Sequence, residues 1–412
     1  MKLLPQEEMS NFYAMGEISL DGSIVPVNGV LPGAILASSC QKGIICPREN
    51  AQEALWASSD LQVLPARNIL EVLNHFKGGY FIPAPVMEEI PQQINYPDFK
   101  DVKGQEVAKR AAEISASGGH NMLMIGPPGS GKSMIASRIP GIMPELTSKE
   151  ILETSMIYSV AGSIKEGRLV TTRPYRAPHH NTSMPALVGG GTKAKPGEVS
   201  LAHNGILFLD EFPEFPRQVL DSLRQPLENR DITVSRVKSH VTYPANFQLI
   251  AAMNPCKCGY LEDASRACSK APKCANEYQN KLSGPLLDRI DIHVEVPAQN
   301  PMEAFDKKAA ENSAAIKSRV AAVHEVQRNR FAGGVIRNNA QIIGEDLEKF
   351  CTLEKESKEL LSKASEKLNL SMRGHTRVLR VARTIADMDF AENIQRKHMA
   401  EALFFRQLNY AR

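Results

Sequence analysis

The sequence of 412 residues has few aromatic side chains and almost no excess of charge. Aromatic residues make up 6% of the chain, with a single tryptophan, and 49 Lys and Arg residues stand against 46 Asp and Glu residues. The resulting net charge of +3 is too small to indicate a nucleic-acid partner by itself. With 42% hydrophobic residues, the chain is nevertheless too apolar to be disordered as a whole.

A long hydrophobic run and an export signal are also absent from the sequence. No stretch approaches the roughly 18 consecutive apolar residues that a membrane-spanning helix needs. Glu7 and Glu8 lie where a signal peptide would be basic and then apolar. We therefore expect a soluble, cytoplasmic protein without a membrane partner. The seven cysteines are not expected to form a disulfide framework, because the chain is long and lacks an export signal.

The sequence pattern changes along the chain, and roughly 100 to 200 residues per domain predicts about two to four domains. Short apolar runs alternate with turns up to residue 82, which predicts a small α/β unit, and a proline-rich linker follows. Long helical patterns then separate apolar strands, which predicts a parallel, doubly wound sheet with helices on both faces. A helical lid follows this core. The expected divisions are 1–82, 83–98, 99–300 and 301–412, and the expected core strands are 121–125, 206–209, 247–252 and 290–296.

Residues 126–133 match the phosphate-binding pattern G-x-x-x-x-G-K-[ST], between an apolar strand and a helical segment. In a P-loop, glycines allow backbone N–H groups to turn toward phosphates, Lys132 reaches the β- and γ-phosphates, and Ser133 binds Mg²⁺. A chance match in a chain of this length is on the order of one in a hundred. The predicted nucleotide-binding residues are Gly126, Pro127, Pro128, Gly129, Ser130, Gly131, Lys132 and Ser133.

A second apolar strand ends in two carboxylates, Asp210 and Glu211. Beside a P-loop, ATP hydrolysis requires one Asp that binds the metal and a second carboxylate next to the attacking water, and such a strand can supply both. We assign Asp210 to Mg²⁺ and Glu211 to the general base. The interval between Lys132 and Asp210 is long for one crossover. It therefore predicts an insertion, whose tip we expect at 174–181 and 188–197.

Two further polar residues lie at the ends of predicted strands. Asn254 follows the strand at 247–252 and could hold the attacking water, although Asn-Pro is also a common turn. Arg289 precedes the last strand, and a guanidinium from a neighbouring subunit would stabilise the charge on a transferring phosphoryl group. A surface ion pair with Asp288 or Asp291 is the other interpretation of Arg289.

These four elements, in this order, resemble the AAA+ ATPases. The segments RAPHHNTSMPALVGGG, KPGEVSLAHNGILFLDEFPEF, MNPCKCGY and KLSGPLLDRIDIHVEVP are similar to the magnesium-chelatase-like branch, and in particular to its ComM/YifB family. The resemblance covers essentially the whole chain. It implies an AAA+ α/β core with a helical lid, and a homohexamer that binds ATP and Mg²⁺ between its subunits.

The same resemblance implies roles for single residues. Asn254 corresponds to sensor 1, and Arg289 corresponds to an arginine finger that acts in trans. A lid arginine corresponds to sensor 2; Arg373 is the best match, and Arg377 and Arg380 are alternatives because periodicity cannot choose among them. The insertion before Asp210 corresponds to the helix-2 insert of the family.

The resemblance further implies DNA translocation, with helicase and branch-migration activity in natural transformation or recombination. The residues themselves show an alternating pattern at 231–243 that predicts a hairpin carrying Arg236 and Lys238. Together with Lys193 and Lys195 on the insertion, six copies of this hairpin would line a basic channel suited to the DNA backbone. A solvated charged hairpin is the alternative. The competing function is a chaperone-like AAA+ motor that remodels a protein or a metal-chelatase complex.

The first 82 residues resemble the C-terminal half of the Lon-protease-like domain that precedes the ATPase module in this family. Leu31 occupies the position of the catalytic lysine, and the half that carries the serine is absent. Without a nucleophile or a base, proteolysis is not expected. From this resemblance we expect the Lon-like domain to be N-terminally shortened in this sequence.

Four of the cysteines lie close together directly after Asn254. Four thiolates within about twenty residues suit tetrahedral Zn²⁺, although the spacing is looser than usual. Reduced, unligated thiols are the alternative. We expect structural roles rather than metal binding for His179 and His180. The candidate zinc ligands are Cys256, Cys258, Cys268 and Cys274.

Overall fold

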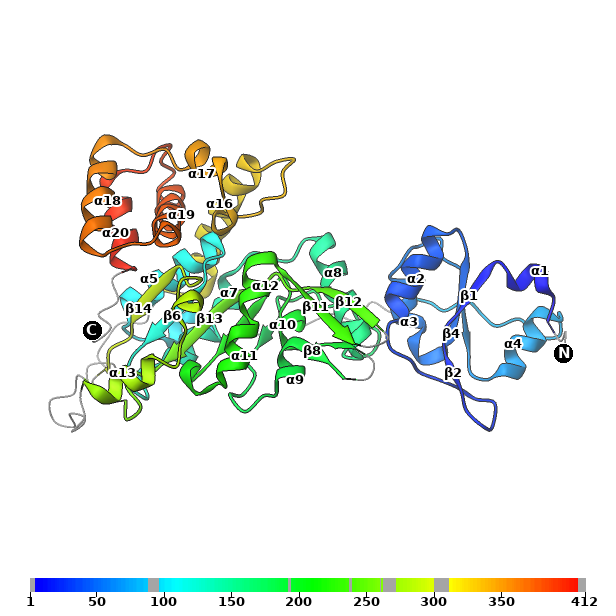
Figure 1. Cartoon of the computed structure of the whole chain (residues 1–412). Coiled ribbons are helices and arrows are strands. Elements are labelled where there is room, and N and C mark those ends of the chain that lie inside the picture. Colours follow the sequence, from blue (N-terminus) through cyan, green and yellow to red (C-terminus); the bar gives the residue numbers. More distant parts are fainter. Residues whose placement is uncertain are drawn as a thin grey trace.

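The computed structural model describes residues 4–87, 96–191, 194–236, 239–259, 261, 272–299 and 311–406. A small N-terminal α/β region, a central parallel sheet between helices and a C-terminal group of helices follow one another along the chain (Figure 1). This arrangement confirms the predicted α/β fold with a C-terminal helical region. Among the helices of the described residues, none has both the length and the apolar character needed to cross a bilayer.

The N-terminal region is a three-stranded parallel sheet with helices on both faces. Its strands, in spatial order, are β1 (Phe12–Ala14), β4 (Gly43–Pro47) and β5 (Val63–Ala66). Successive side chains of a strand point to opposite faces. Ile44 therefore packs with α2 (Val30–Ser39) and α3 (Ala51–Leu55), whereas Ile45 packs with Val72 of α4 (Ile69–Phe76). The remaining elements are α1 (Gln6–Met9) and the hairpin of β2 (Glu17–Ile18) and β3 (Ile24–Val25).

A buried carboxylate joins the N-terminal region to the central one. Glu53 of α3 is 5% exposed and accepts hydrogen bonds from the backbone N–H of Leu31, at 3.1 Å, and from the hydroxyl of Ser159. Ser159 belongs to α8 (Ser148–Ala161) of the central region. The indole Nε1 of Trp56 also donates to the carbonyl oxygen of Gly167, at 3.0 Å. Since Leu31 is fully buried beside this contact, its position forms part of an interface.

The central region is built on a five-stranded sheet in which every pair is parallel. The spatial order is β14 (Ile292–Glu295), β6 (Met122–Ile125), β13 (Gln248–Met253), β10 (Ile206–Leu209) and β7 (Tyr175–Arg176). One face packs on α5 (Glu106–Gly118), α7 (Ile139–Ile142) and the C-terminal helices. The other packs on α9 (Met184–Val188), α10 (Glu198–Leu201), α11 (Arg217–Ser222), α12 (Arg224–Asn229) and α14 (Gly284–Leu287). The four predicted core strands are present, with bounds that differ by at most two residues.

The fifth strand corrects the prediction for residues 174–181, which placed them at the tip of an insertion. Tyr175 and Arg176 instead pair with Ile206 and Leu207 of β10 and form the edge of the central sheet. Two residues that follow a proline give no hydrophobic run, so the sequence offered no strand signal.

Two hairpins lie side by side at one end of the central region (Figure 1). The predicted hairpin at 231–243 is confirmed as β11 (Asp231–Arg236) and β12 (Ser239–Pro244). The second is formed by β8 (Gly189–Gly190) and β9 (Lys195–Pro196). They are bound together, because the hydroxyl of Tyr243 donates to the carbonyl oxygen of Ala194 at 2.9 Å.

The C-terminal helices pack against the amino end of the sheet. They are α16 (Ser313–Arg330), α17 (Glu345–Phe350), α18 (Lys355–Lys367), α19 (Met372–Met388) and α20 (Arg396–Phe404). The buried carboxylate of Asp291, just before β14, pairs with Arg377 of α19 at 2.5 Å and accepts the backbone N–H of Asn121 at 3.0 Å. Burial alone would raise the pKa of Asp291, but Arg377 and His120 hold it well below the usual range. This ion pair fixes α19 to the sheet.

We predict that Arg377→Ala destabilises the chain by about 3 to 5 kcal/mol, since it leaves a buried carboxylate without its cation. Urea denaturation followed by circular dichroism measures the difference. Because the folded state lowers the pKa of Asp291, the contribution is complete above about pH 4 and fades as the pH falls further. Arg328→Ala is the matched control, because Arg328 pairs with Glu325 at the surface and should cost less than about 1 kcal/mol. If Arg377→Ala lowered the free energy of unfolding no more than Arg328→Ala does, the prediction would be wrong.

Candidate active site

The predicted P-loop follows β6 and leads into α6 (Lys132–Ala136). The backbone conformation of this loop requires glycine at three positions. Gly129 and Gly131 have φ angles of 77° and 94°, in the left-handed region that favours glycine. A Cβ on Gly126 would lie 2.0 Å from the carbonyl oxygen of Val296. The loop therefore has the tight turn that presents backbone N–H groups to phosphate.

The structure brings Lys132 and Asn254 together at the carboxyl end of the sheet. The ammonium group of Lys132 donates to the carbonyl oxygens of Gly126 and Pro127, both at 2.8 Å, and to Oδ1 of Asn254 at 3.3 Å. Burial lowers the pKa of Lys132, and the carboxylate of Asp210 partly offsets this effect. Asn254, directly after its strand, thus lies beside the P-loop lysine.

Ser133 and Asp210 meet at the same edge. The hydroxyl of Ser133 donates to Oδ2 of Asp210 at 2.6 Å, and the other carboxylate oxygen of Asp210 accepts the backbone N–H of Glu211 at 2.9 Å. A hydroxyl and a carboxylate are hard oxygen donors of the type that Mg²⁺ prefers. Their convergence next to Lys132 fits a magnesium ion bound together with phosphates.

Glu211 has a partner that the sequence did not indicate. Its Oε2 lies 3.0 Å from Nδ1 of His180, and its φ of 51° places it in the left-handed region. The His180 ring lies tilted against the ring of His179, with centroids 4.0 Å apart, and is in edge-to-face contact with Phe215. His180 was expected to have a structural role rather than to bind a metal, and its ring contacts the candidate base. It comes from the loop after β7, the strand that the sequence did not reveal.

Arg289 and Arg373 lie together at the opposite, amino edge of the sheet. Arg289 is held there because its carbonyl oxygen accepts a bond from the side chain of Asn121, just before β6, at 3.0 Å. The P-loop begins after the other end of β6, which at about 3.3 Å per residue is about 13 Å away. Glu228 is shared: its Oε2 lies 2.6 Å from Nη2 of Arg289, and its Oε1 lies 3.9 Å from Nη2 of Arg373. The ion-pair partner of Arg289 is therefore Glu228, and neither Asp288 nor Asp291.

The structure also separates Arg373 from the alternatives for the lid arginine. Arg377 is bound to the buried Asp291, and Nε of Arg380 donates to the carbonyl oxygen of Ile342 at 2.6 Å. Arg373 is 61% exposed and lies one turn before Arg377 on the same face of α19. Of the three side chains, that of Arg373 is the most exposed.

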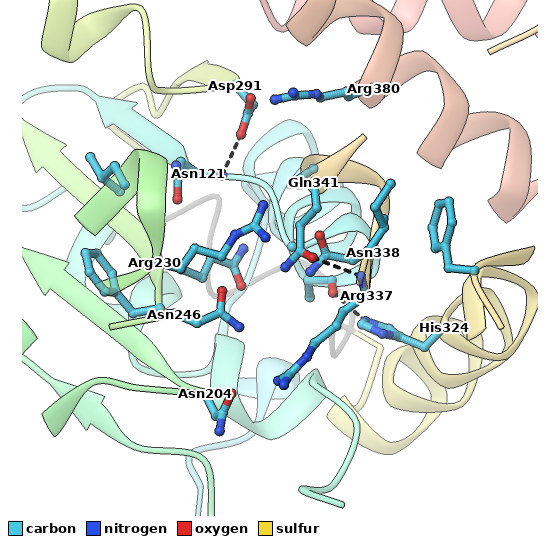
Figure 2. Close-up of a pocket in the computed structure, with 18 of the residues that line it drawn as sticks. Asn121, Asn204, Arg230, Asn246, Asp291, His324, Arg337, Asn338, Gln341 and Arg380 are labelled. Atoms are coloured by element: carbon cyan, nitrogen blue, oxygen red, sulfur yellow. Dashed lines mark hydrogen bonds between the residues drawn. The ribbon is translucent and has the colours of Figure 1, made fainter. Parts of the chain in front are cut away.

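A pocket of about 780 Å³ opens between the amino edge of the sheet and the C-terminal helices (Figure 2). Both Arg289 and Arg373 line it. In total, eight arginines and one lysine face it against four carboxylates, so it is electropositive. Figure 2 shows Arg230, directly after α12, and Asn246, before β13, on one side of the pocket. Arg337 and Asn338, from the loop after α16, lie on the other side.

Three of the four candidate zinc ligands converge. The Sγ atoms of Cys256, Cys258 and Cys274 lie within 4.8 Å of one another, and those of Cys256 and Cys258 are 3.0 Å apart. Burial and contact with Cys258 raise the pKa of Cys256 to about 11. Cys268 lies outside the described residues. The cluster touches the P-loop, because a Cβ on Gly259 would be 2.5 Å from Cδ of Pro128.

The residues predicted to contact DNA are only partly described. Arg236 ends β11, and Lys195 is exposed in β9 of the neighbouring hairpin. Lys193 and Lys238 lie outside the described residues. The two hairpins contact each other where the hydroxyl of Tyr243, near the base of the first hairpin, donates to the carbonyl oxygen of Ala194 in the second.

Comparison with known proteins identifies the family. Residues 98–304 match the model described as "Magnesium chelatase, subunit ChlI", and residues 310–406 match "Magnesium chelatase, subunit ChlI C-terminal". Competence protein ComM of Haemophilus influenzae is 40% identical over 412 residues, which cover 98% of this chain and 79% of that protein. The chain belongs to the magnesium-chelatase-like ComM/YifB family of AAA+ proteins.

Two further ComM/YifB relatives match over the same extent. The protein YifB of Salmonella typhimurium is 40% identical and that of Escherichia coli 39% identical, each over 407 residues that cover 98% of this chain and 79% of the relative. The first family model contains the P-loop and Arg289, and the second contains Arg373. The candidate site residues at both edges of the sheet therefore lie within segments that match the family models.

Proposed function

We propose that this protein is a Mg²⁺-dependent ATPase that acts in the cytoplasm as a homohexameric DNA motor, in helicase and branch-migration steps of natural transformation or recombination. One observation carries the ATPase proposal: Lys132, Ser133 and Asp210 converge at the end of the sheet. Lys132 would bind the β- and γ-phosphates, while Ser133 and Asp210 would hold Mg²⁺, which supplies charge neutralisation there.

The remaining groups at this edge would act on the attacking water. Glu211 would accept its proton on a carboxylate oxygen, and His180 would orient Glu211 through the 3.0 Å contact. Asn254 would position the water from the neighbouring strand. Arg289 and Arg373 lie at the far edge and would reach the phosphates bound by an adjacent subunit, so a second copy would complete each site.

The DNA part of the proposal is supported by the two joined hairpins and by the ComM relative, whose name links it to competence. In a ring, the hairpin tips of six subunits would lie close together. Arg236, Lys238, Lys193 and Lys195 would then contact the sugar-phosphate backbone without reading bases.

We predict that single-stranded or branched DNA raises ATP turnover several-fold in the wild type and not in an Arg236→Ala, Lys238→Ala double variant. The double variant should keep its turnover without DNA, because the P-loop is unchanged. Lys355→Ala, Lys358→Ala removes two exposed lysines from α18 and should leave the stimulation intact. Glu211→Gln serves as the inactive control. Wild-type ATP turnover that does not change with either form of DNA would contradict the proposal of a DNA motor.

A chaperone-like motor that remodels a protein or a metal-chelatase complex is the alternative. The observation in its favour is that the family model matching the core is named after a chelatase subunit. In that case a protein substrate, and not DNA, would stimulate ATP hydrolysis.

We also propose that the cysteine cluster binds Zn²⁺ in a structural role, with Cys268 as the fourth ligand. Three convergent thiols provide the soft donors that zinc takes in closed tetrahedral sites. Gln279 donates to the carbonyl oxygen of Pro255 at 2.9 Å, and Gly259 packs on Pro128. The ion would thus stabilise the loop that follows Asn254 and packs on the P-loop.

We predict about one zinc ion per purified chain, measured by elemental mass spectrometry, because a closed thiolate site holds its metal tightly. Cys256→Ser should lose the metal and lower the melting temperature. Cys40→Ser is the control, since Cys40 is exposed and lies in the N-terminal region. A metal-free wild type whose thiols all react with Ellman's reagent would refute the site.

A further inference from the structure

Glu228 contacts both arginines at the amino edge of the sheet. It belongs to the last turn of α12, and its two carboxylate oxygens divide between Arg289, at 2.6 Å, and Arg373, at 3.9 Å. Arg289 comes from the central region and Arg373 from the C-terminal helices. One carboxylate therefore spans the two regions where their guanidinium groups approach each other.

Arg289 is largely buried, so its positive charge depends on the carboxylate of Glu228 for compensation. The Arg289 side chain is only 8% exposed. Its Nη1 donates to the carbonyl oxygen of Pro285 at 2.7 Å, and its buried Nε has no hydrogen-bond partner within the described part of the chain. The side chains of Glu228 and Arg373 are more exposed, at 55% and 61%. Two cations at one carboxylate repel each other once its charge is removed. Glu228 thus offsets a repulsion that would separate the pair.

The backbone holds Glu228 in place. Helix α12 ends at Arg230, which adopts a left-handed φ of 61° and donates its N–H to the carbonyl oxygen of Pro226 at 2.9 Å. The carbonyl oxygen of Arg230 accepts the N–H of Ala245, just beyond β12, at 2.8 Å. Because both ends of the β11–β12 hairpin are fixed at this point, the helix turn that carries Glu228 has a defined position.

We propose that Glu228 is a positioning residue that holds Arg289 and Arg373 as one pair of guanidinium groups for the phosphates of an adjacent subunit. This inference rests on the proposed ATPase function, in which those arginines act in trans. Glu228 itself does not touch the nucleotide; it fixes where the two positive charges lie before the nucleotide arrives. Such pre-alignment matters because a misplacement of about 1 Å can cost on the order of 100-fold in rate.

The test is steady-state ATP turnover of Glu228→Gln and Glu228→Ala in the full chain. We expect kcat to fall at least about 10-fold in Glu228→Ala and less in Glu228→Gln, whose amide oxygen still accepts one bond. KM and the binding of a fluorescent ATP analogue should not change, since Lys132 lies at the other edge.

Glu145→Gln is the matched control. Glu145 lines the same pocket but pairs with Lys317 at 3.0 Å, so its kcat should stay within about two-fold of the wild type. Either an unchanged kcat in Glu228→Ala or a rise in KM alone would overturn the proposal. A wild type without ATP turnover would refute the ATPase function, and the role of Glu228 with it.

Discussion

The buried ion pair between Asp291 and Arg377 determines the geometry of the far edge of the sheet. Asp291 lies two residues after Arg289 and also accepts the backbone N–H that starts β6. Arg377 lies one helical turn after Arg373. When the buried pair forms, it therefore brings α19 to the sheet and sets Arg289 and Arg373 side by side, within reach of Glu228.

That placement supports the proposal that each chain contributes two separate parts of a phosphate-transfer site. In a parallel sheet, all strands end at one edge, and the P-loop, Asp210 and Asn254 follow three of them. The arginines precede strand β14 or come from the lid, so they gather at the other edge. Residues that act on one phosphate cannot meet across the sheet within a subunit. A ring in which each subunit faces its neighbour head to tail would bring them together.

The local motifs predicted the carboxyl edge well. Lys132, Ser133, Asp210 and Asn254 lie where their strands place them, because each follows an apolar run that the sequence displays. The non-local partners were not predictable. His180 follows a two-residue strand without a hydrophobic signal, and Glu228 meets Arg289 only through the fold. Helical periodicity could not show that Arg377 pairs with the buried Asp291 either, since that contact forms only in the fold.

The most direct test of this account mixes subunits that carry Lys132→Ala with subunits that carry Arg289→Ala. Each variant alone should assemble and hydrolyse almost no ATP. If the two halves of a site come from adjacent copies, one interface in four of an equal random mixture has both intact groups, so activity should return to about a quarter of the wild-type value. Mixed rings that form normally and remain inactive at every ratio would contradict a site shared between subunits.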